Sequence, residues 1–466
     1  MVFTSHIFLF YFLPLVLLIY YAVPTSSRNV TLTLASYVFY GWWKPWFVLL
    51  MLTSTVVDYV AGRVISTSEN QGSRRLALVA SIIVNLGLLA FFKYYMFTME
   101  NLNALSQAVG GPAFQVLKVT LPIGISFYTF QTLSYTIDVY RRTAAPVKRF
   151  GDFACFVSLC PQLIAGPIVR YNTIANQLAD RPHNISVFGS GAAIFILGFA
   201  KKILIANPLG LIADSAFAAE SPWMLDAWLG VTAYAFQIYF DFSGYSDMAI
   251  GLGRMFGFEF PRNFNAPYQA TSITDFWRRW HISLSTFLRD YLYIPLGGSR
   301  LGAIRTYVNL ALVMLLGGLW HGAKWNFVAW GAFHGSLLAL ERYFAGRGFS
   351  LSLPTFLRIV ATFVLVLISW VLFRAETFAA AGQFFASMLG FGGQGELSAL
   401  VAAELYQPRL MCTLALAVFL SAQPVQGLDW VKQLSLPRVI ALIGLLLLAI
   451  AEMFGQAFNP FLYFRF

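Results

Sequence analysis

The chain has 466 residues, of which 58% are hydrophobic and only 11% are charged. About a quarter of the residues of a soluble protein are charged, so this composition excludes a soluble globular protein and indicates a polytopic membrane protein. The formal net charge of +11 could suggest nucleic-acid binding. Because the basic residues are spread through short loops rather than gathered in one patch, membrane orientation explains them better, and we expect no nucleic-acid partner.

The N-terminal part predicts five membrane-crossing helices. The first apolar segment has no basic stretch and no small-residue cleavage site, so we interpret it as a retained helix rather than a signal peptide. The five segments cover residues 6–23, 30–43, 47–62, 76–97 and 121–140. Basic residues lie in alternate loops, at 28, at 63 to 75 and at 141 to 149. The positive-inside rule therefore places the N-terminus outside and the loop at Arg141 in the cytoplasm.

The following segment, residues 153–169, is interrupted by Pro161, Gly166 and Pro167, so it can enter the membrane and return without crossing. The topology of the later segments depends on that choice. Apolar runs follow at residues 187–206, at 225–258 with a polar break around 241–244, on both sides of His321, and at 356–373, 411–422 and 439–454. At about 20 residues per span, we expect roughly 11 or 12 crossings. Residues 390–404 are glycine-rich and read as an external loop.

We find no repeat of fixed period, no long linker and no soluble domain, so residues 1–466 are expected to form a single integral-membrane domain. The three cysteines, Cys155, Cys160 and Cys412, have no metal-ligand or disulfide spacing. We therefore interpret them as small core residues, with a thioester-forming cysteine as a minor alternative.

Residues 275–334 carry three of the five histidines in the chain. If residues 275–291 form one helix, tryptophan and leucine side chains share one face with His281, and arginine and aspartate side chains share the other. Such a helix would lie in the membrane interface and direct His281 inward.

His321 ends an apolar run that begins near Thr306, and glycines at 317, 318 and 322 surround it. We therefore expect an irregular backbone there, which is tolerated at membrane depth only inside protein or beside a wet cavity. A helix from Thr306 would place His321 on the order of 22 Å from the basic end at Arg305. The two histidines are thus predicted to mark opposite ends of one polar route across the bilayer.

Ionisable groups at membrane depth are functional candidates, because each is costly unless it is paired or hydrated. Most of them are expected to be structural, and His334, between two nearby glycines, reads as helix packing. Asp241 lies in YFDFSGYSD, where the hydroxyls of Tyr239, Ser243 and Tyr245 could bind a substrate, although such a break more often shapes a cavity wall. The remaining candidates are Asp58, Lys93, Asp138, Asp247, Arg374 and Glu452.

Histidine is the natural general base at neutral pH, because its unperturbed pKa is about 6.5. By spacing alone, His281 and His321 are as compatible with satisfied core histidines as with catalytic ones. The glycines around His321 and the lack of a nearby carboxylate favour catalysis. No HxxxH or HxxE spacing and no Cys/His cluster occurs, so we expect no metal. The absence of GxxxxGK[ST] and GxSxG motifs argues against ATP-driven transport and soluble-type esterase chemistry.

Several sequence blocks in order resemble the membrane-bound O-acyltransferase (MBOAT) superfamily, and within it the membrane subunits of alginate O-acetylation. They run nearly end to end and include LPIGISFYTFQTLSYTIDVYR, CPQLIAGPIVR, YFDFSGYSDMAIGLGRMFGFEFPRNFNAPY, DFWRRWHISLSTFLRDYLYIPLGG, LWHGAKWNFVAWGAFHG and FLYFRF. The resemblance implies an all-α bundle of about 11 spans, with re-entrant and interfacial helices around a central funnel. Its near-invariant histidine corresponds to His321, and its second characteristic histidine to His281.

The resemblance further implies an O-acyltransferase of the bacterial inner membrane. An acetyl group from a cytoplasmic thioester, acetyl-CoA or a similar donor, would pass to a hydroxyl outside, with no tightly bound cofactor. A periplasmic SGNH-type partner and the exopolysaccharide assembly complex would deliver it to a polymer such as alginate. We expect His321 to act as general base and His281 to orient the donor at the inner mouth. The funnel is predicted to include Trp280, Trp320, Asn326, Tyr239, Asp241, Ser243 and Tyr245, with Trp320 and Asn326 as candidate oxyanion donors.

Three alternatives stay open at this point. The donor and acceptor could be a D-alanyl group and teichoic acid, or an acetyl group and peptidoglycan or cellulose. The same cavity could serve a transporter or flippase without chemistry. The chain could also be a scaffold of a polymer-secretion complex, in which case its loss would disrupt export rather than acetylation alone.

Overall fold

The computed structural model describes residues 1–164, 166–348, 353–393, 403, 405–456 and 461–462, and all regular structure in these ranges is helical. This confirms the predicted all-α membrane fold. The chain divides into two compact units. Unit 1 comprises residues 1–192 and 249–261, and unit 2 comprises residues 193–248 and 262–466. Two helices, α10 (Ile185–Ala200) and α12 (Met224–Met255), contribute residues to both units. The single-domain organisation stays a prediction.

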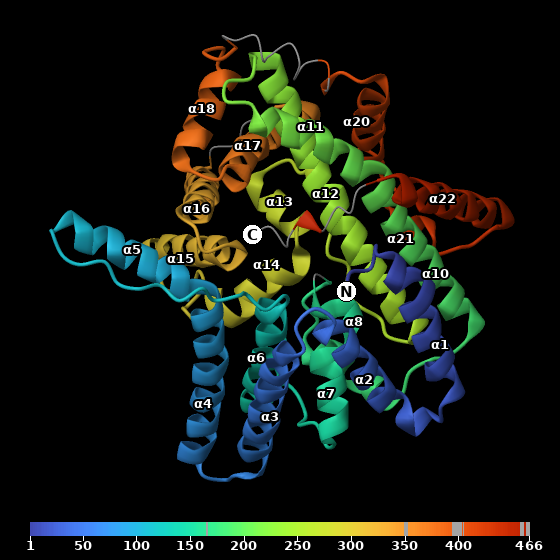
Figure 1. Cartoon of the computed structure of the whole chain (residues 1–466). Helices are drawn as coiled ribbons and strands as arrows, with labels where there is room; N and C mark the ends of the chain where they lie inside the picture. Colours follow the sequence, from blue (N-terminus) through green and yellow to red (C-terminus); the bar gives the residue numbers. More distant parts are fainter. Residues whose placement is uncertain (165, 349–352, 394–402, 404, 457–460, 463–466) are drawn as a thin grey trace. The chain divides into compact units, whose positions relative to one another are not determined.

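Unit 1 is a set of helices in which α3, α4 and α6 pack against one another (Figure 1). At their centre the buried carboxylate of Asp58 accepts hydrogen bonds from Ser81 Oγ at 2.5 Å and from Asn85 Nδ2 at 2.8 and 2.9 Å. These bonds satisfy a charged group that membrane burial would otherwise penalise. The elements are η1 (Phe8–Phe12), α1 (Leu13–Ala22), η2 (Thr25–Ser27), α2 (Arg28–Gly41), α3 (Trp46–Thr67), α4 (Gln71–Leu89), η3 (Ala90–Tyr94), α5 (Tyr95–Ala108), α6 (Ile125–Tyr140), α7 (Phe150–Ser158), α8 (Cys160–Leu163) and α9 (Tyr171–Ala179).

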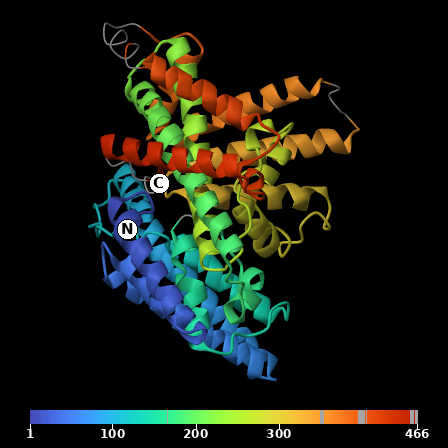
Figure 2. The ribbon, with the colours of Figure 1, turned by 90° about the vertical axis from the view of Figure 1, so that its right-hand side faces the viewer.

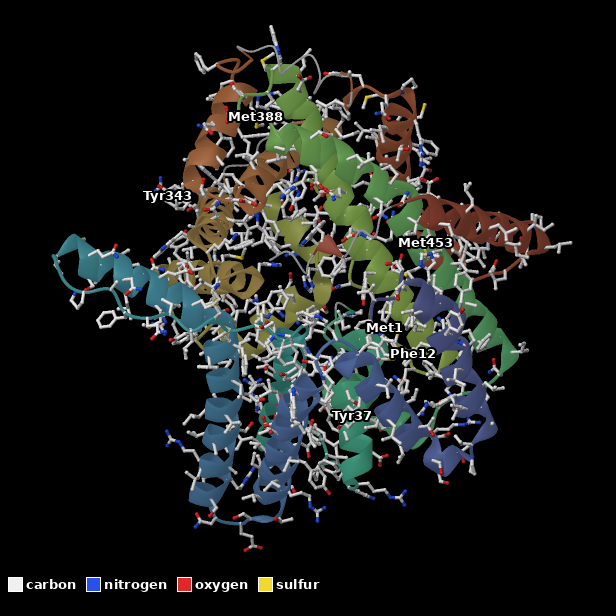
Figure 3. The ribbon with its side chains drawn as sticks, viewed as in Figure 1. Met1, Phe12, Tyr37, Tyr343, Met388 and Met453 are labelled. Carbon is white, nitrogen blue, oxygen red and sulfur yellow. The ribbon has the colours of Figure 1, made fainter. Side chains whose placement is uncertain are left out.

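In unit 2, helices α15 and α16, coloured gold in Figures 1 and 2, pack against each other. Met388, labelled in Figure 3, ends α18, and its carbonyl accepts a hydrogen bond of 3.0 Å from the Trp228 indole at the start of α12. Besides α12, the elements are η4 (Lys201–Ala206), α11 (Asn207–Ala218), η5 (Pro267–Gln269), α13 (Ile273–Arg279), α14 (Ile282–Leu288), η6 (Arg289–Tyr293), α15 (Ala303–His321), α16 (Trp325–Gly346), α17 (Thr355–Arg374), α18 (Phe378–Met388), α20 (Pro408–Ser421), α21 (Gly427–Trp430) and α22 (Leu436–Gly455).

Six helical stretches within the described residues are long and apolar enough to cross a membrane, which makes the chain a multi-pass membrane protein. They are residues 46–67, 71–108, 185–218, 303–321, 355–374 and 436–455. The predicted total of 11 or 12 crossings stays a prediction. Helices α7 and α8, of 9 and 4 residues, are too short to cross, which agrees with a segment that enters without crossing.

Three sequence expectations need comment. The polar break in the apolar run at residues 225–258 lies within one continuous helix, because α12 runs over 32 residues. Its two buried carboxylates, Asp241 and Asp247, pair with lysine side chains. Cys155 and Cys160 are buried as expected, but Cys412 is exposed on α20, so it is not a core residue. Most of the expected loop at residues 390–404 lies outside the described residues.

Helices α10 and α12 approach closely within unit 2 at a pair of glycines. A Cβ atom on Gly198 would lie 2.4 Å from the carbonyl oxygen of Gly244, and one on Gly244 would lie 2.7 Å from the carbonyl oxygen of Gly198. Small residues allow two helix backbones to meet in this way inside a membrane. The contact brings the residues that follow α10, Lys201 and Lys202, against the middle of α12.

Substituting Gly198 with alanine tests this close contact. The added methyl group would overlap backbone atoms, which cannot move as a flexible side chain can, so Gly198→Ala should lower the free energy of unfolding by roughly 1–3 kcal/mol. Gly189→Ala on the same helix is the matched control, because nothing lies within 4 Å of its added Cβ. Thermal unfolding of both variants in detergent is the measurement. Equal melting temperatures would contradict the packing described.

Candidate active site

His281 lies at a sharp break between α13 and α14. The prediction of one continuous amphipathic helix over residues 275–291 is wrong: α13 ends at Arg279, and His281 has a left-handed backbone with φ of 44°. Asn263 holds this break together. Its carbonyl oxygen accepts from Ile282 N at 2.9 Å, and its Oδ1 accepts from Ser283 Oγ at 2.9 Å and lies 3.2 Å from His281 Nδ1. A non-glycine residue in this conformation is strained and is found most often at functional sites.

His321 lies at the C-terminal end of α15. The expectation of an irregular backbone around the glycines is wrong for Gly317 and Gly318, which lie within the helix, and the chain becomes extended only at Gly322. A Cβ atom on Gly318 would lie 2.2 Å from the carbonyl oxygen of Phe327. The glycine is needed so that α15 and α16 can pack closely and hold His321 against Trp330.

The two histidines lie close together, with 6.4 Å between their ring centroids. The prediction that they mark opposite ends of a route across the membrane is therefore wrong. The prediction relied on the distance along α15 from Arg305 to His321. The sharp break after α13, however, places His281 next to the end of α15 that carries His321. The indole of Trp320 contacts both rings, at centroid distances of 5.7 Å to His281 and 5.0 Å to His321.

His281 is completely buried. Phe242 packs its edge against the imidazole at 4.7 Å, and Nε2 makes no hydrogen bond to any described residue. Because burial penalises the charged form, the pKa of His281 is lowered to about 3, so the ring is neutral at physiological pH. A neutral ring can accept a proton or orient a neighbour without adding an unpaired charge to the interior.

A small cavity of about 360 Å³ lies beside His321 within unit 2. Its walls are mostly large aromatic side chains, and its open centre has room for only about one or two water molecules. A substrate can therefore enter only if some of the wall moves. The lining residues are Ile238, Asp241, Phe242, Trp280, His321, Trp330, Trp370, Phe373, Phe461 and Leu462.

Of the nine predicted site residues, three line this cavity, namely His321, Trp280 and Asp241. The others lie outside its lining. Asn326 Nδ2 donates to the carbonyl of Ala375 at 2.7 Å, a contact that joins α16 to the end of α17. Tyr239 Oη donates to Gln426 Oε1 at 3.4 Å. His281, Trp320, Ser243 and Tyr245 are buried behind the cavity wall.

The sequence analysis missed two lysines that are central to the site. Lys202 forms a buried ion pair with the Asp241 carboxylate, and Lys201 Nζ lies 2.6 Å from Asp247 Oδ2. Both lysines lie in η4, a π-helical segment of the kind that often occurs at functional sites. Two adjacent lysines inside the apolar run at 187–206 were the available signal, because each must find an anionic partner at that depth.

Asp241 also fixes the C-terminal part of the cavity wall. Its Oδ2 accepts a hydrogen bond of 2.8 Å from the backbone N–H of Leu462, and Phe461 packs on Phe242 and Tyr245 at 5.8 and 4.7 Å. Trp330, Trp370 and Phe373 complete the wall from α16 and α17. No sequence pattern brought these residues together, because they are separated by up to 221 positions in the chain.

Within the described part of the chain, no group of three or more histidine, cysteine or carboxylate side chains could hold a metal ion. The cavity instead offers one imidazole, one carboxylate paired with lysine, and a set of aromatic rings. This arrangement defines a membrane-embedded helical protein with a buried histidine beside a small, mostly aromatic cavity.

The chain belongs to the membrane-bound O-acyltransferase family, whose sequence profile matches residues 144–380. The protein is therefore an O-acyltransferase. The matched range includes His281 and His321, the two lysines of η4 and their partners on α12.

The chain is 44% identical to the probable alginate O-acetylase AlgI of Azotobacter vinelandii over the whole of both chains. It is 48% identical to the protein of the same name from Pseudomonas aeruginosa, over 84% of this chain and 75% of that one. It is 38% identical to the peptidoglycan O-acetyltransferase of Helicobacter pylori, over 84% of this chain and 80% of that one.

Replacing Lys202 with methionine tests the buried ion pair. The change leaves the Asp241 carboxylate buried without a counter-charge, which should lower the free energy of unfolding by about 3–5 kcal/mol. Adding Asp241→Asn should recover much of the loss. Lys201→Met is the matched control, and it should cost less because the Lys201 side chain is 21% exposed against 4% for Lys202. Thermal unfolding in lipid nanodiscs gives the comparison, and a double variant as unstable as Lys202→Met would contradict the pairing.

Proposed function

We propose that the protein moves an acetyl group from a cytoplasmic thioester to a hydroxyl group on the outer side of the membrane, for O-acetylation of an exopolysaccharide such as alginate. The observation that carries the proposal is the position of His321, a buried imidazole that faces a small aromatic cavity inside the membrane domain. The similarity to probable alginate O-acetylases over the full chain supports the choice of reaction and polymer.

His321 is the proposed general base. Its imidazole takes the proton of the acceptor hydroxyl as the oxygen forms a bond to the thioester carbonyl carbon. The tetrahedral intermediate then collapses, the carbon–sulfur bond breaks, and the thiolate leaves with the proton that His321 had accepted. General-base catalysis of this kind typically contributes 10²- to 10⁴-fold in rate.

Trp330 is a better oxyanion donor than Trp320 or Asn326. Its indole lines the cavity, its ring centroid lies 5.2 Å from that of His321, and its Nε1–H makes no hydrogen bond to any described residue. A buried donor without an acceptor is costly, and such groups are often kept for a ligand or a transition state. We infer that this N–H stabilises the negative charge that develops on the carbonyl oxygen.

We propose that His281 positions neighbouring side chains. This differs from the sequence-based expectation that it orients the donor at the inner mouth of a funnel. His281 is not part of the cavity lining, and its ring contacts both the Trp320 indole and the His321 imidazole. Neutral imidazole packed at this point would keep the Trp320 and His321 rings in a fixed orientation. It would also avoid a second positive charge beside a base that must accept a proton.

The cavity favours an acetyl group over a D-alanyl group. Its aromatic walls leave little open volume, which suits a two-carbon acyl group. A D-alanyl group would also bring an ammonium charge, and the one carboxylate in the lining, Asp241, is already neutralised by Lys202. Burying an ammonium group without a counter-charge is strongly unfavourable.

The remaining parts of the proposal concern the partners. Acetyl-CoA or a similar acyl thioester would be the donor, and the protein would lie in the bacterial inner membrane. A periplasmic SGNH-type protein would pass the acetyl group to the polymer. Peptidoglycan is the second candidate polymer, because the peptidoglycan O-acetyltransferase of Helicobacter pylori is also similar over most of the chain.

Substituting His321 with alanine tests whether the cavity catalyses acyl transfer or only transports a substrate. His321→Ala should reduce O-acetylation of the exported polysaccharide by at least 100-fold, because the base is lost. Mass spectrometry of the polymer, together with immunoblots of the membrane fraction, is the measurement. His183→Ala, a histidine of unit 1 that bonds to Tyr20, is the control and should leave acetylation in place. Acetylation that persists in His321→Ala at normal protein levels would exclude His321 as the base.

Removing the Trp330 donor should reduce turnover specifically. Trp330→Phe keeps an aromatic ring in the wall but removes the N–H, so kcat should fall roughly 100-fold with a small change in KM. The readout is release of free thiol from acetyl-CoA by the purified protein with a hydroxyl acceptor. Trp228→Phe is the control, because that indole bonds only to the Met388 carbonyl away from the cavity. A loss confined to KM would contradict an oxyanion role.

A further inference from the structure

Unit 1 contains a second pocket, which shares no lining residue with the cavity at His321. It has a volume of about 480 Å³ and lies where the end of α3, the start of α4 and the loop after α6 meet. Two arginines, Arg74 and Arg142, are part of its lining, whereas no carboxylate is. The positive-inside rule assigns this end of the helices to the cytoplasm, so the pocket is expected at the inner membrane surface.

Arg74 is buried, and among the residues that the structure describes no carboxylate pairs with it. The residue is only 8% exposed, yet its guanidinium contacts only neutral oxygens, Gln71 Oε1 at 3.5 Å and the Tyr140 carbonyl at 3.3 Å. Its Nε makes no hydrogen bond within the described residues, and the group lies over the Tyr140 ring at 5.6 Å. A buried cation paired only with neutral groups is unfavourable, and an anion in the pocket would satisfy it.

Arg142 occupies a position where glycine is usual. The N–H of Thr143 bonds to the Asp138 carbonyl at 2.9 Å and that of Arg142 bonds to the Val139 carbonyl at 3.1 Å, which is a Schellman motif at the end of α6. Arg142 is its left-handed residue, with φ of 61°. Arginine pays a conformational cost there that glycine would not. The fold therefore accepts strain in order to place a second guanidinium group at this pocket.

We propose that this pocket binds a phosphate ester at the cytoplasmic membrane surface. The planar guanidinium groups can form bidentate hydrogen bonds with phosphate oxygens. The volume exceeds that of a single inorganic anion, and apolar residues such as Ile65 and Val139 in the lining suit the carbon skeleton attached to the phosphate. An anionic phospholipid headgroup and a phosphate group of the thioester donor share this chemistry. The donor-phosphate source rests on the proposed function, whereas the lipid-headgroup source does not.

Arg142→Gly is the decisive variant, because it removes the charge and relieves the left-handed strain at the same time. We expect binding of phosphatidylglycerol, measured by native mass spectrometry of the delipidated full-length protein, to weaken roughly fivefold or more. The melting temperature should stay the same or rise, so a loss of binding cannot be attributed to unfolding. Arg74→Gln should weaken the binding of phosphatidylglycerol more than Arg142→Gly does. Arg75→Gln, an exposed neighbour on α4 outside the pocket, should have no effect.

A second arm identifies the source of the phosphate. Phosphatidylcholine and coenzyme A are titrated in the same way against the wild type, Arg142→Gly and Arg75→Gln. Selective weakening with phosphatidylglycerol supports a lipid headgroup site, and selective weakening with coenzyme A supports a donor-phosphate site. If Arg142→Gly and Arg74→Gln bind both probes as tightly as the wild type, the proposal is overturned.

Discussion

The structure of unit 2 depends on neutralising charge inside a membrane. Lys201 and Lys202 are adjacent in η4, and their partners Asp247 and Asp241 lie roughly 9 Å apart along α12 at 1.5 Å per residue. The two lysines therefore reach in different directions along the same helix. This is possible only because Gly198 and Gly244 let α10 and α12 approach at backbone distance. Buried charges without such partners would be too costly in this environment.

The cavity beside His321 depends on the same ion pair. Asp241 is held by Lys202 on one side and accepts the Leu462 N–H on the other, so one carboxylate joins η4, α12 and the C-terminal part of the cavity wall. Opposite this wall, His321 and Trp330 are fixed by the tight packing of α15 on α16 at Gly318. The result is a cavity in which the charge of the carboxylate is already matched. The His321 imidazole and the Trp330 indole N–H are the groups of this cavity that the proposed reaction uses.

The pocket in unit 1 is also explained by the cost of burying an unpaired charge. In this pocket, however, the lining contains no carboxylate that could pair with the arginines. Where a buried cation belongs to the fold, as at Lys202, a carboxylate pairs with it. Where the contacts of a buried cation are all neutral, as at Arg74, the missing anion is expected to come from outside the chain. The strained Arg142 beside it makes this difference hard to explain by packing alone. The charge of Lys202 therefore has a structural role, whereas we propose that the charge of Arg74 is available for a ligand.

The sequence by itself determined the class of fold and most of the helix positions, because apolar run length is a local property. It also singled out His321 and Asp241, which line the same cavity. It could not determine that His281 and His321 lie 6.4 Å apart, because a left-handed residue at the break between α13 and α14 has no sequence signal here. It likewise gave no sign that Asn326 is engaged with Ala375, or that Trp330 and Leu462 share one cavity. Those relations join residues far apart in the chain, and only the tertiary packing of the helices decides them.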